Sequence, residues 1–142
     1  MSTTNRVIQP YLDFDGRCEE AIKFYQDALG AEVLMKMHFK DSPDQSHISP
    51  GSKDKVMHST LRVGESIFMA SDGHCTGKPN FQGVSMSLTL PEADAAKCFN
   101  ALAAGGKVAM PLEKTFFSPA FGMVADKFGL TWMVMVPGPQ SK

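Results

Sequence analysis

The sequence predicts an α+β fold in which a βαβββ module occurs twice. Within each half, the hydrophobic period changes from about two to about three and a half and back, as strand, helix and strand would require. A set of matching residues supports the repeat: Ala21, Phe24, Ala28, Gly30 and Val33 recur 75 residues later as Ala96, Phe99, Ala103, Gly105 and Val108. Residue types that recur at one fixed spacing indicate a repeated structural unit. Two such modules, placed side by side, can curl mixed and antiparallel sheets around one cup.

The first module begins with a predicted strand over residues 7–14. Pro10 cannot donate a ladder hydrogen bond, which favours an edge or a bulge. Asp15 and Gly16 then form a turn that can cap a helix. The helix itself is predicted by an apolar stripe with spacing i, i+3, i+4, i+7 and i+8: Ala21, Phe24, Tyr25, Ala28 and Leu29. Gly30 ends it as a C′ glycine.

The rest of the first module is a set of strands interrupted by one long polar segment. We expect strands at 31–39, 56–63 and 66–71. The polar segment 40–55 contains two prolines and is predicted to be a long mobile loop, of the kind that is a functional lid or simply disordered. Residues 72–82 are predicted to be a linker.

The second module follows the same plan. A strand is expected at 83–90, and Pro91 followed by acidic residues is typical of a helix start. The helix is indicated by the apolar stripe Ala95, Cys98, Phe99, Leu102 and Ala103. Gly105 and Gly106 end it, a strand at 107–112 follows, and a hairpin at 121–136 closes the module. We therefore predict a single domain over 1–142, with module one at about 6–75 and module two at about 81–137.

Composition excludes several classes of function. The 142 residues are 43% hydrophobic, which suffices for one core, and the net charge is −1. Because the basic residues are scattered, a nucleic-acid partner is not expected. The chain has no apolar run of the roughly 20 residues that a membrane helix needs and no signal-peptide pattern. Cys18, Cys75 and Cys98 are far apart and odd in number, which predicts reduced thiols in a cytoplasmic protein.

Four stretches of the chain, in order, resemble a known superfamily. They are PYLDFDGRCEEAIKFYQDALGAE, MHSTLRVGESIFMASDG, EKTFF and FGMVADKFGLTWMV. Together they resemble the vicinal oxygen chelate (VOC) superfamily, which includes glyoxalase, bleomycin-resistance protein and extradiol dioxygenase, and more narrowly its PhnB-like branch. The resemblance covers about residues 7–136. It implies a glyoxalase-like domain with a U-shaped pocket, usually in a homodimer.

The resemblance also locates a metal site. In metal-using members, one side chain from each of four strands holds a divalent ion that polarises substrate oxygens. The matching positions are Gln9, about Met69, about Ser85 and about Met133. None is His, Asp or Glu, so these side chains suit Fe, Mn, Ni or Zn poorly. We therefore predict no metal ligands and no cofactor, with a divalent metal as the alternative.

PhnB-like sequences are often described as ubiquinone-pathway methyltransferases. A nucleotide-type cofactor requires a glycine-rich turn after a strand and before a helix. The only glycine pair, Gly105-Gly106, follows a predicted helix and precedes a strand. No motif therefore supports methyl transfer.

Histidines are the candidate catalytic residues. His58, in a predicted strand, either faces the cup as an acid, base or hydrogen-bond donor, or lies on the outer face, since alternation alone does not fix the inner face. His58, Asp72 and His74 could together bind a metal, but an Asp-Gly-His triplet is more typical of a polar turn. His38 and His47 border or lie within the long loop.

Other candidate pocket residues are apolar. Six methionines lie on predicted strands: Met57, Met69, Met86, Met123, Met133 and Met135. We interpret most as core residues, with Met69 and Met133 as pocket residues. Phe116, Phe117 and Trp132 form either a stacking wall or a dimer interface, and the family counterpart of Phe117 is frequently Trp bordering the pocket. Glu65, Asp126 and Lys127 are interpreted as turn residues.

Three hypotheses of function follow. The first is a homodimeric protein of the bleomycin-resistance kind that binds or sequesters an unknown small molecule without a metal. The second is an enzyme with a displaced or metal-independent site, using His58 and perhaps Gln9. The third is a structural or interaction module whose cups are filled by its own side chains.

Overall fold

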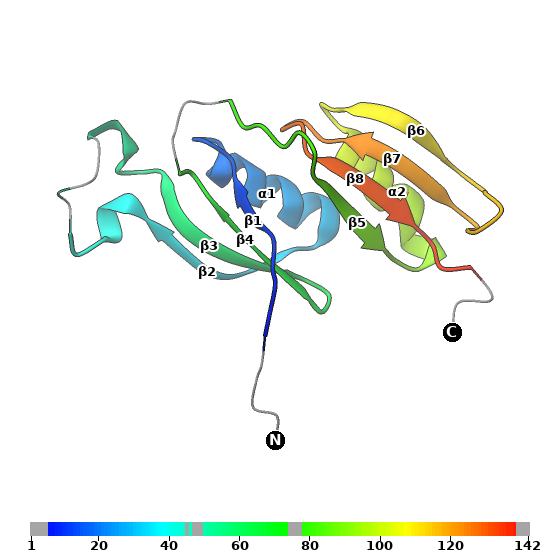
Figure 1. Ribbon diagram of the computed structural model, residues 1–142, viewed down its shortest axis with the longest axis horizontal. Helices are drawn as coiled ribbons and strands as arrows, with labels where there is room; N and C mark the ends of the chain where they lie inside the picture. Colours follow the sequence, from blue (N-terminus) through cyan, green and yellow to red (C-terminus); the bar gives the residue numbers. More distant parts are fainter. Residues whose placement is uncertain (1–5, 45, 47–49, 74–77, 139–142) are drawn as a thin grey trace, which may run out of the picture. The chain divides into compact units, whose positions relative to one another are not determined.

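The computed structural model describes residues 6–44, 46, 50–73 and 78–138 (Figure 1). Within them the predicted βαβββ order occurs twice. The first copy consists of β1 (Tyr11–Asp13), α1 (Cys18–Leu29), β2 (Glu32–His38), β3 (Val56–Val63) and β4 (Ser66–Ser71). The second consists of β5 (Ser85–Thr89), α2 (Glu92–Ala103), β6 (Lys107–Glu113), β7 (Phe121–Ala125) and β8 (Thr131–Met135). The copies belong to two compact units, Met1–Lys78 (unit 1) and Pro79–Lys142 (unit 2). The prediction that both modules form one domain around one cup stays a prediction.

Unit 1 is a mixed sheet in the order β1-β4-β3-β2, with α1 on one face. β1 and β4 are parallel, whereas β4, β3 and β2 are antiparallel neighbours. Tyr25 of α1 contacts Phe68 of β4 edge-on, with ring centroids 6.3 Å apart, and Phe14 at 6.0 Å. This aromatic group is buried and forms the core between helix and sheet.

Both ends of α1 have the predicted turn chemistry. Asp15 and Gly16 have φ of 54° and 106°, which reverse the chain before the helix. At the other end Gly30 is left-handed (φ 69°), and its N–H donates to the carbonyls of Gln26 and Tyr25. The buried stripe is rotated slightly from the predicted one and consists of Cys18, Ala21, Ile22, Tyr25 and Ala28.

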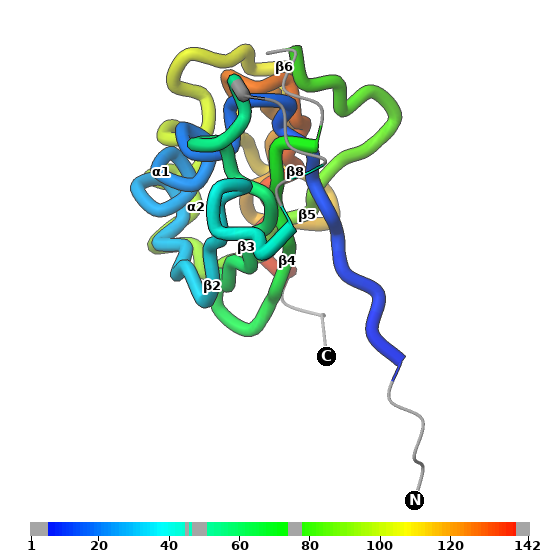
Figure 2. The backbone as a smooth tube through the Cα atoms, turned by 90° about the vertical axis from the view of Figure 1, so that its left-hand side faces the viewer, coloured from blue at the N-terminus to red at the C-terminus, as the bar shows by residue number. Residues whose placement is uncertain are grey.

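The first strand is shorter than predicted. A strand from residue 7 is wrong, because β1 begins at Tyr11. Pro10 has no N–H to donate, although its carbonyl accepts the Met69 N–H at 2.9 Å. The segment before it runs away from the sheet (Figure 2), and Ile8 is 99% exposed. The predicted edge position is confirmed, since β1 is an edge strand.

The connection between β2 and β3 has more regular structure than predicted. Short 3₁₀ turns, η1 (Phe39–Asp41) and η2 (Pro50–Ser52), lie near its two ends. The N–H of Phe39 donates to the carbonyl of Lys55, and that of Lys40 donates to Lys53, both at 3.0 Å. Both ends of the segment 40–55 therefore have hydrogen-bonded structure that was not predicted, and its mobility stays a prediction. His47 lies outside the described residues.

Unit 2 repeats the arrangement with the sheet order β5-β8-β7-β6 and α2 on one face. The two glycines after α2 have separate reasons to be glycine. Gly105 has φ of 76°, and a Cβ on Gly106 would lie 2.1 Å from the carbonyl oxygen of Ala125. The pair thus ends α2 and lets the chain pass close to the end of β7. Neither helix of the described residues is long and apolar enough to cross a membrane.

Candidate functional site

Unit 1 presents a sheet face on the side away from α1. Because Phe68 contacts α1, its strand neighbour Met69 points to the opposite side. The strand register extends this side across the sheet: Tyr11 pairs with Met69, Met69 with Thr60, and Thr60 with Met35. Residues that pair directly across strands share a face. We call this surface, made of Tyr11, Met35, Met37, His58, Thr60 and Met69, the open face of unit 1.

His58 lies on this open face, on the side of the sheet away from α1, and its role in a cup stays a prediction. Its Nδ1 is 3.2 Å from the Tyr11 hydroxyl, and its Nε2 is 3.4 Å from the Thr60 hydroxyl. The Tyr11 and His58 rings are 5.6 Å apart, and Tyr11 is 54% exposed. Hydroxyl groups both donate and accept, so this trio can pass a proton or hold a polar ligand group in either tautomer of His58.

The metal alternative for His58 is not supported by its surroundings. Asp72 is fully buried, and its carboxylate accepts the backbone N–H groups of Gly16 (2.7 Å), Cys18 (2.8 Å) and Val56 (3.0 Å). Both of its oxygens are thus directed at the backbone around the start of α1 and β3. His74 lies outside the described residues. Among the residues that are described, no three His, Cys, Asp or Glu side chains are grouped to hold a metal ion.

Unit 2 also presents a sheet face away from its helix. Trp132 and Val134 are buried with Val124 on the side of α2, so Met133 and Met135 point to the other side. Ser87 pairs with Met133, and Met133 with Met123. We call the surface made of Ser85, Ser87, Met110, Met123, Met133 and Met135 the open face of unit 2. Two predicted pocket residues, Ser85 and Met133, lie on it.

Trp132 lies elsewhere. Its indole N–H donates to the Asp126 carboxylate at 2.9 Å, and it is only 3% exposed. The other Asp126 oxygen accepts the N–H groups of Phe128 (2.9 Å) and Leu130 (3.1 Å). Asp126 is therefore a buried organiser of the hairpin as well as a turn residue. Trp132 belongs to the helix side and not to the open face.

The predicted aromatic pair is connected to the open face of unit 2. Phe116 contacts Phe117, and Phe117 contacts Phe121, with ring centroids 5.0 and 5.2 Å apart. Phe121 pairs with Met135 and so lies at the edge of that face. Phe116 is 95% exposed. The Ser118 hydroxyl lies within hydrogen-bond distance of both the Ala120 and the Val136 carbonyl oxygens and can donate to either, which ties this β6–β7 loop to the end of β8.

Gln9 is half-exposed and lies in the segment before β1, not on the strand. The carbonyl of its neighbour Pro10 accepts the Met69 N–H, so Gln9 directly precedes the residue at which the chain joins β4. Met69 lies on that face, as stated above. The four positions at which the resemblance places metal ligands thus offer an amide, two thioethers and a hydroxyl.

Methionine placement was the least predictable feature. No methionine is among the buried hydrophobic residues of the described chain. The interpretation as core residues is therefore wrong for Met123 and Met135, which lie on the open face of unit 2, whereas half-buried Met86 pairs with Trp132 on the helix side. In β7 and β8 the core positions are occupied by Gly122, Val124, Trp132 and Val134, while methionines take the open face.

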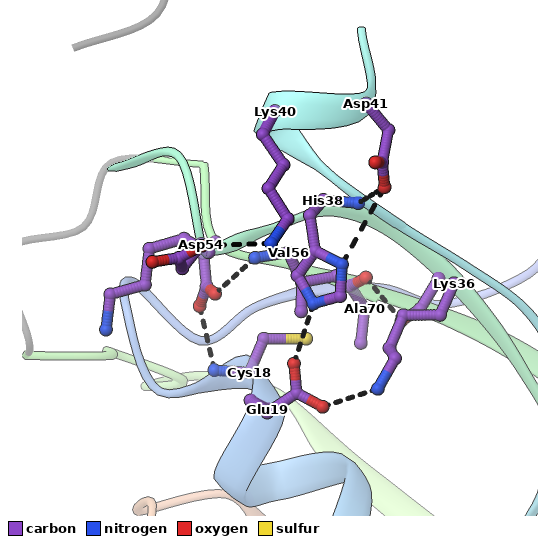
Figure 3. Close-up of polar contacts among 12 residues, drawn as sticks. Cys18, Glu19, Lys36, His38, Lys40, Asp41, Asp54, Val56 and Ala70 are labelled. Atoms are coloured by element: carbon purple, nitrogen blue, oxygen red, sulfur yellow. Dashed lines mark hydrogen bonds and ion pairs between the residues drawn. The ribbon is translucent and has the colours of Figure 1, made fainter. Parts of the chain in front are cut away.

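A second polar group, on the α1 side of unit 1, was not predicted (Figure 3). Glu19 of α1 binds Lys36, and its Oε1 is 3.0 Å from Nε2 of His38. Desolvation raises the pKa of Glu19, but the hydrogen bonds from Lys36 and His38 outweigh it and hold the pKa below its usual value. Asp41 accepts the His38 backbone N–H at 2.9 Å. These contacts join α1, β2 and η1, and we assign them to the structure of unit 1.

Beneath this group lies Cys18, which is buried. Burial, followed by the charge of Asp72, raises the pKa of its thiol, while a contact with Ser59 lowers it. Burial also raises the pKa of Cys98. Because thiolate is the reactive form, neither residue has the environment of a nucleophile.

Two mixed sheets, each in a βαβββ unit with a helix on one face, define a protein of the VOC class. The chain belongs to the family described as 3-demethylubiquinone-9 3-methyltransferase, whose model matches residues 6–135, and so to the PhnB-like branch of that superfamily.

Curated relatives support this membership. Protein YjdN of Escherichia coli K12 is 36% identical over 138 residues, which cover 91% of this chain and 94% of that protein. The uncharacterized protein Rv0887c of Mycobacterium tuberculosis H37Rv is 32% identical over 139 residues, covering 92% and 74%.

Solved structures agree. Protein PA1353 from Pseudomonas aeruginosa has a TM-score of 0.83 at 42% identity, covering 94% of this chain and 98% of that one. A PhnB protein from Bacillus cereus, described as a putative 3-demethylubiquinone-9 3-methyltransferase, has a TM-score of 0.77 at 28% identity, covering 92% and 99%. The fosfomycin resistance protein FosX from Listeria monocytogenes, with a TM-score of 0.64 at 6% identity and coverage of 97% and 98%, shares the fold alone.

Proposed function

We propose that this protein binds or sequesters a small organic molecule as a cytoplasmic homodimer, in the manner of bleomycin-resistance proteins and without a catalytic divalent metal. The observation that carries the proposal is the chemistry of the open faces. Each combines thioethers and hydroxyl groups with at least one aromatic neighbour. Ligand sites are commonly apolar surfaces with a few polar groups that fix orientation.

The side chains at the former metal-ligand positions support the metal-free part of the proposal. Gln9, Met69, Ser85 and Met133 are all neutral. Hard and borderline divalent ions prefer carboxylate and imidazole ligands, which offset their charge. A divalent ion at these four positions would keep its charge uncompensated.

The open face of unit 1 suggests the character of the ligand. Polarizable methionine side chains adapt to flat apolar surfaces. Beside Met69, the Tyr11, His58 and Thr60 trio supplies hydrogen-bond donors and acceptors within one small area. We infer a ligand with a flat apolar body and one polar edge that lies against His58.

The homodimer part of the proposal draws on exposed apolar surface next to an edge strand. Val7 is 70% exposed and Ile8 99% exposed, immediately before edge strand β1. Apolar side chains beside an unpaired strand edge suit a contact with a second chain.

The proposal is tested by small-molecule capture. Purified protein is incubated with a metabolite extract, washed, and its retained compounds are identified by mass spectrometry. Met69→Glu places a charge on the open face and should reduce retention at least about tenfold, because an apolar ligand would desolvate that charge. Lys23→Ala, on the exposed side of α1, is the matched control and should retain the same compounds. Equal retention by folded Met69→Glu would overturn the proposal.

A second candidate function is metal-independent catalysis, favoured by the contacts of His58. A histidine held between two hydroxyl groups can act as a general acid or base. Vicinal dicarbonyl compounds, glutathione adducts and catechols are the substrates to screen. If turnover is found, His58→Ala should lower kcat by about 10²–10⁴-fold. Unchanged turnover would remove His58 from the mechanism.

Methyl transfer, which the family description names, is not proposed. The glycine pair Gly105-Gly106 lies between α2 and β6, where Gly106 is needed for close approach to Ala125. A phosphate-binding turn would lie after a strand and before a helix. The pair therefore has a packing role.

A further inference from the structure

Three methionines lie side by side across three strands of unit 2. Met110 of β6 pairs with Met123 of β7, and Met123 pairs with Met133 of β8. We call these three residues the methionine row. In a regular antiparallel ladder, directly paired residues have Cβ atoms about 4.5–5.5 Å apart. The Met123–Met133 pair lies in such a ladder, whereas register shifts lie on both sides of Met110 in β6. The flexible methionine side chain then allows three sulfur atoms to converge above the central strand.

The row is accessible and is not a part of the core. Met123 and Met133 are half-exposed, and Met110 is 44% exposed. The buried positions next to them in the same strands are Val124 and Trp132. If these methionines served only as fillers, they would be expected at the buried positions.

The residues next to the row are mostly uncharged, but β6 contributes a charged residue at each end of the same face: Lys107 pairs with Ala125 and Glu113 pairs with Phe121. The neighbouring residues on the same face of β5, β7 and β8 are Ser87, Phe121, Ala125, Thr131 and Met135. The three methionines themselves supply no negative charge to offset that of a divalent ion, and the charges of Lys107 and Glu113 on β6 are opposite in sign. Thioether sulfur is a soft ligand that selects Cu(I) over hard ions. A monovalent ion also requires less charge compensation.

We propose that the methionine row binds one soft monovalent metal ion, of which Cu(I) is the biological example. The site uses β6, β7 and β8, with Met123 as the central ligand. It shares the Met133 position with the four-strand divalent site of the metal-using VOC proteins, but its other two ligands, Met110 and Met123, and its all-thioether chemistry differ from that site. It goes beyond the proposed organic ligand and does not depend on it.

The direct test is NMR of the full chain with ¹³C-labelled methionine methyl groups, titrated with Ag(I) as a redox-stable probe. The parent for the titration carries Cys75→Ala and Cys98→Ala, so that these thiols do not compete. Signals are assigned from single Met→Leu variants, which conserve volume and cost less than about 1.5 kcal/mol. The Met110, Met123 and Met133 methyl signals should shift together and saturate at one equivalent.

Affinity gives a second readout. Competition with a chromophoric Cu(I) chelator under anaerobic conditions should show at least a tenfold weaker complex for Met123→Leu and for Met133→Leu. Met86→Leu is the matched control, because Met86 pairs with Trp132 on the helix side and should not affect binding. Unmoved row signals, or equal affinity of folded Met123→Leu and the parent, would overturn the inference. Organic-ligand capture by the same variants reports on the proposed function separately.

Discussion

Asp72 shows how one buried side chain can fix several segments. Its carboxylate accepts N–H groups from the β1–α1 turn, from the first residue of α1 and from the first residue of β3. In sequence it belongs to an Asp-Gly-His triplet that indicates only a polar turn. Its partners lie 16 to 56 residues away, so no local pattern could have revealed this role.

Asp72→Asn should destabilise the protein by about 2–3 kcal/mol, because a charge-assisted acceptor is lost and an amide N–H group then faces a backbone donor. Urea unfolding followed by circular dichroism measures the change. Asp27→Asn, which removes an exposed ion pair with Lys23, is the control and should cost less than about 0.5 kcal/mol. Equal effects would show that the Asp72 contacts contribute little.

Cys18 predicts a specific pH dependence. Its folded pKa is raised above the ordinary value of 9.0 by burial and by Asp72. Below pH 9 the protonated thiol therefore makes its full contribution to the stability of the fold. As pH rises above 9, this contribution is lost at about 1.4 kcal/mol per pH unit. The free energy of unfolding of the parent should fall relative to that of Cys18→Ala from pH 9 to 10. Parallel pH profiles would contradict this.

His58 and Trp132 mark the limit of sequence prediction for the site. Both were identified as candidates from their type and position, but strand alternation does not tell which face is covered. The structure places His58 away from α1 and Trp132 toward α2, because Phe68 and Val134 define the helix sides. Trp132, which was predicted to belong to a stacking wall or a dimer interface, is thus a core residue whose indole N–H donates to Asp126.

At the scale of elements, the helices and hairpins were predicted closely. The start of β1 and the structure of the β2–β3 connection were predicted less well. Apolar stripes and terminal glycines are local signals, and α1 begins and ends where they indicate. β1 is short because its pairing with β4 covers only Tyr11, Leu12 and Asp13. The hydrogen bonds that join Phe39 to Lys55 depend on a distant partner that has no local signature.

Gly106 supplies a test of how closely unit 2 is packed. Gly106→Ala would place a Cβ 2.1 Å from the Ala125 oxygen and 2.9 Å from Asp126 backbone atoms. Because backbone atoms cannot move aside without distorting the fold, we expect the free energy of unfolding, measured with denaturant, to fall by about 3 kcal/mol or more. Gly51→Ala, where a Cβ meets no heavy atom within 4 Å, should change stability by about 0.5 kcal/mol or less. A neutral Gly106→Ala would refute the close approach.

At the scale of the whole molecule, the repeat in the sequence predicted the architecture. The candidate site could be located only from the registers of the strands. Spacing of alanine, phenylalanine and glycine predicted two βαβββ units, and both form mixed sheets with the same strand order. Register then showed that each unit presents methionines and hydroxyl groups on the face away from its helix. The face could not be predicted because most methionines were interpreted as core residues.

Native mass spectrometry combined with elemental analysis tests the central claim most directly. Protein purified without chelators is measured for oligomer mass, bound metal and carried-over organic ligand. We expect a dimer that releases an organic molecule and holds far less than one divalent ion per chain. One tightly bound divalent ion per chain would contradict the proposed metal-free binding function.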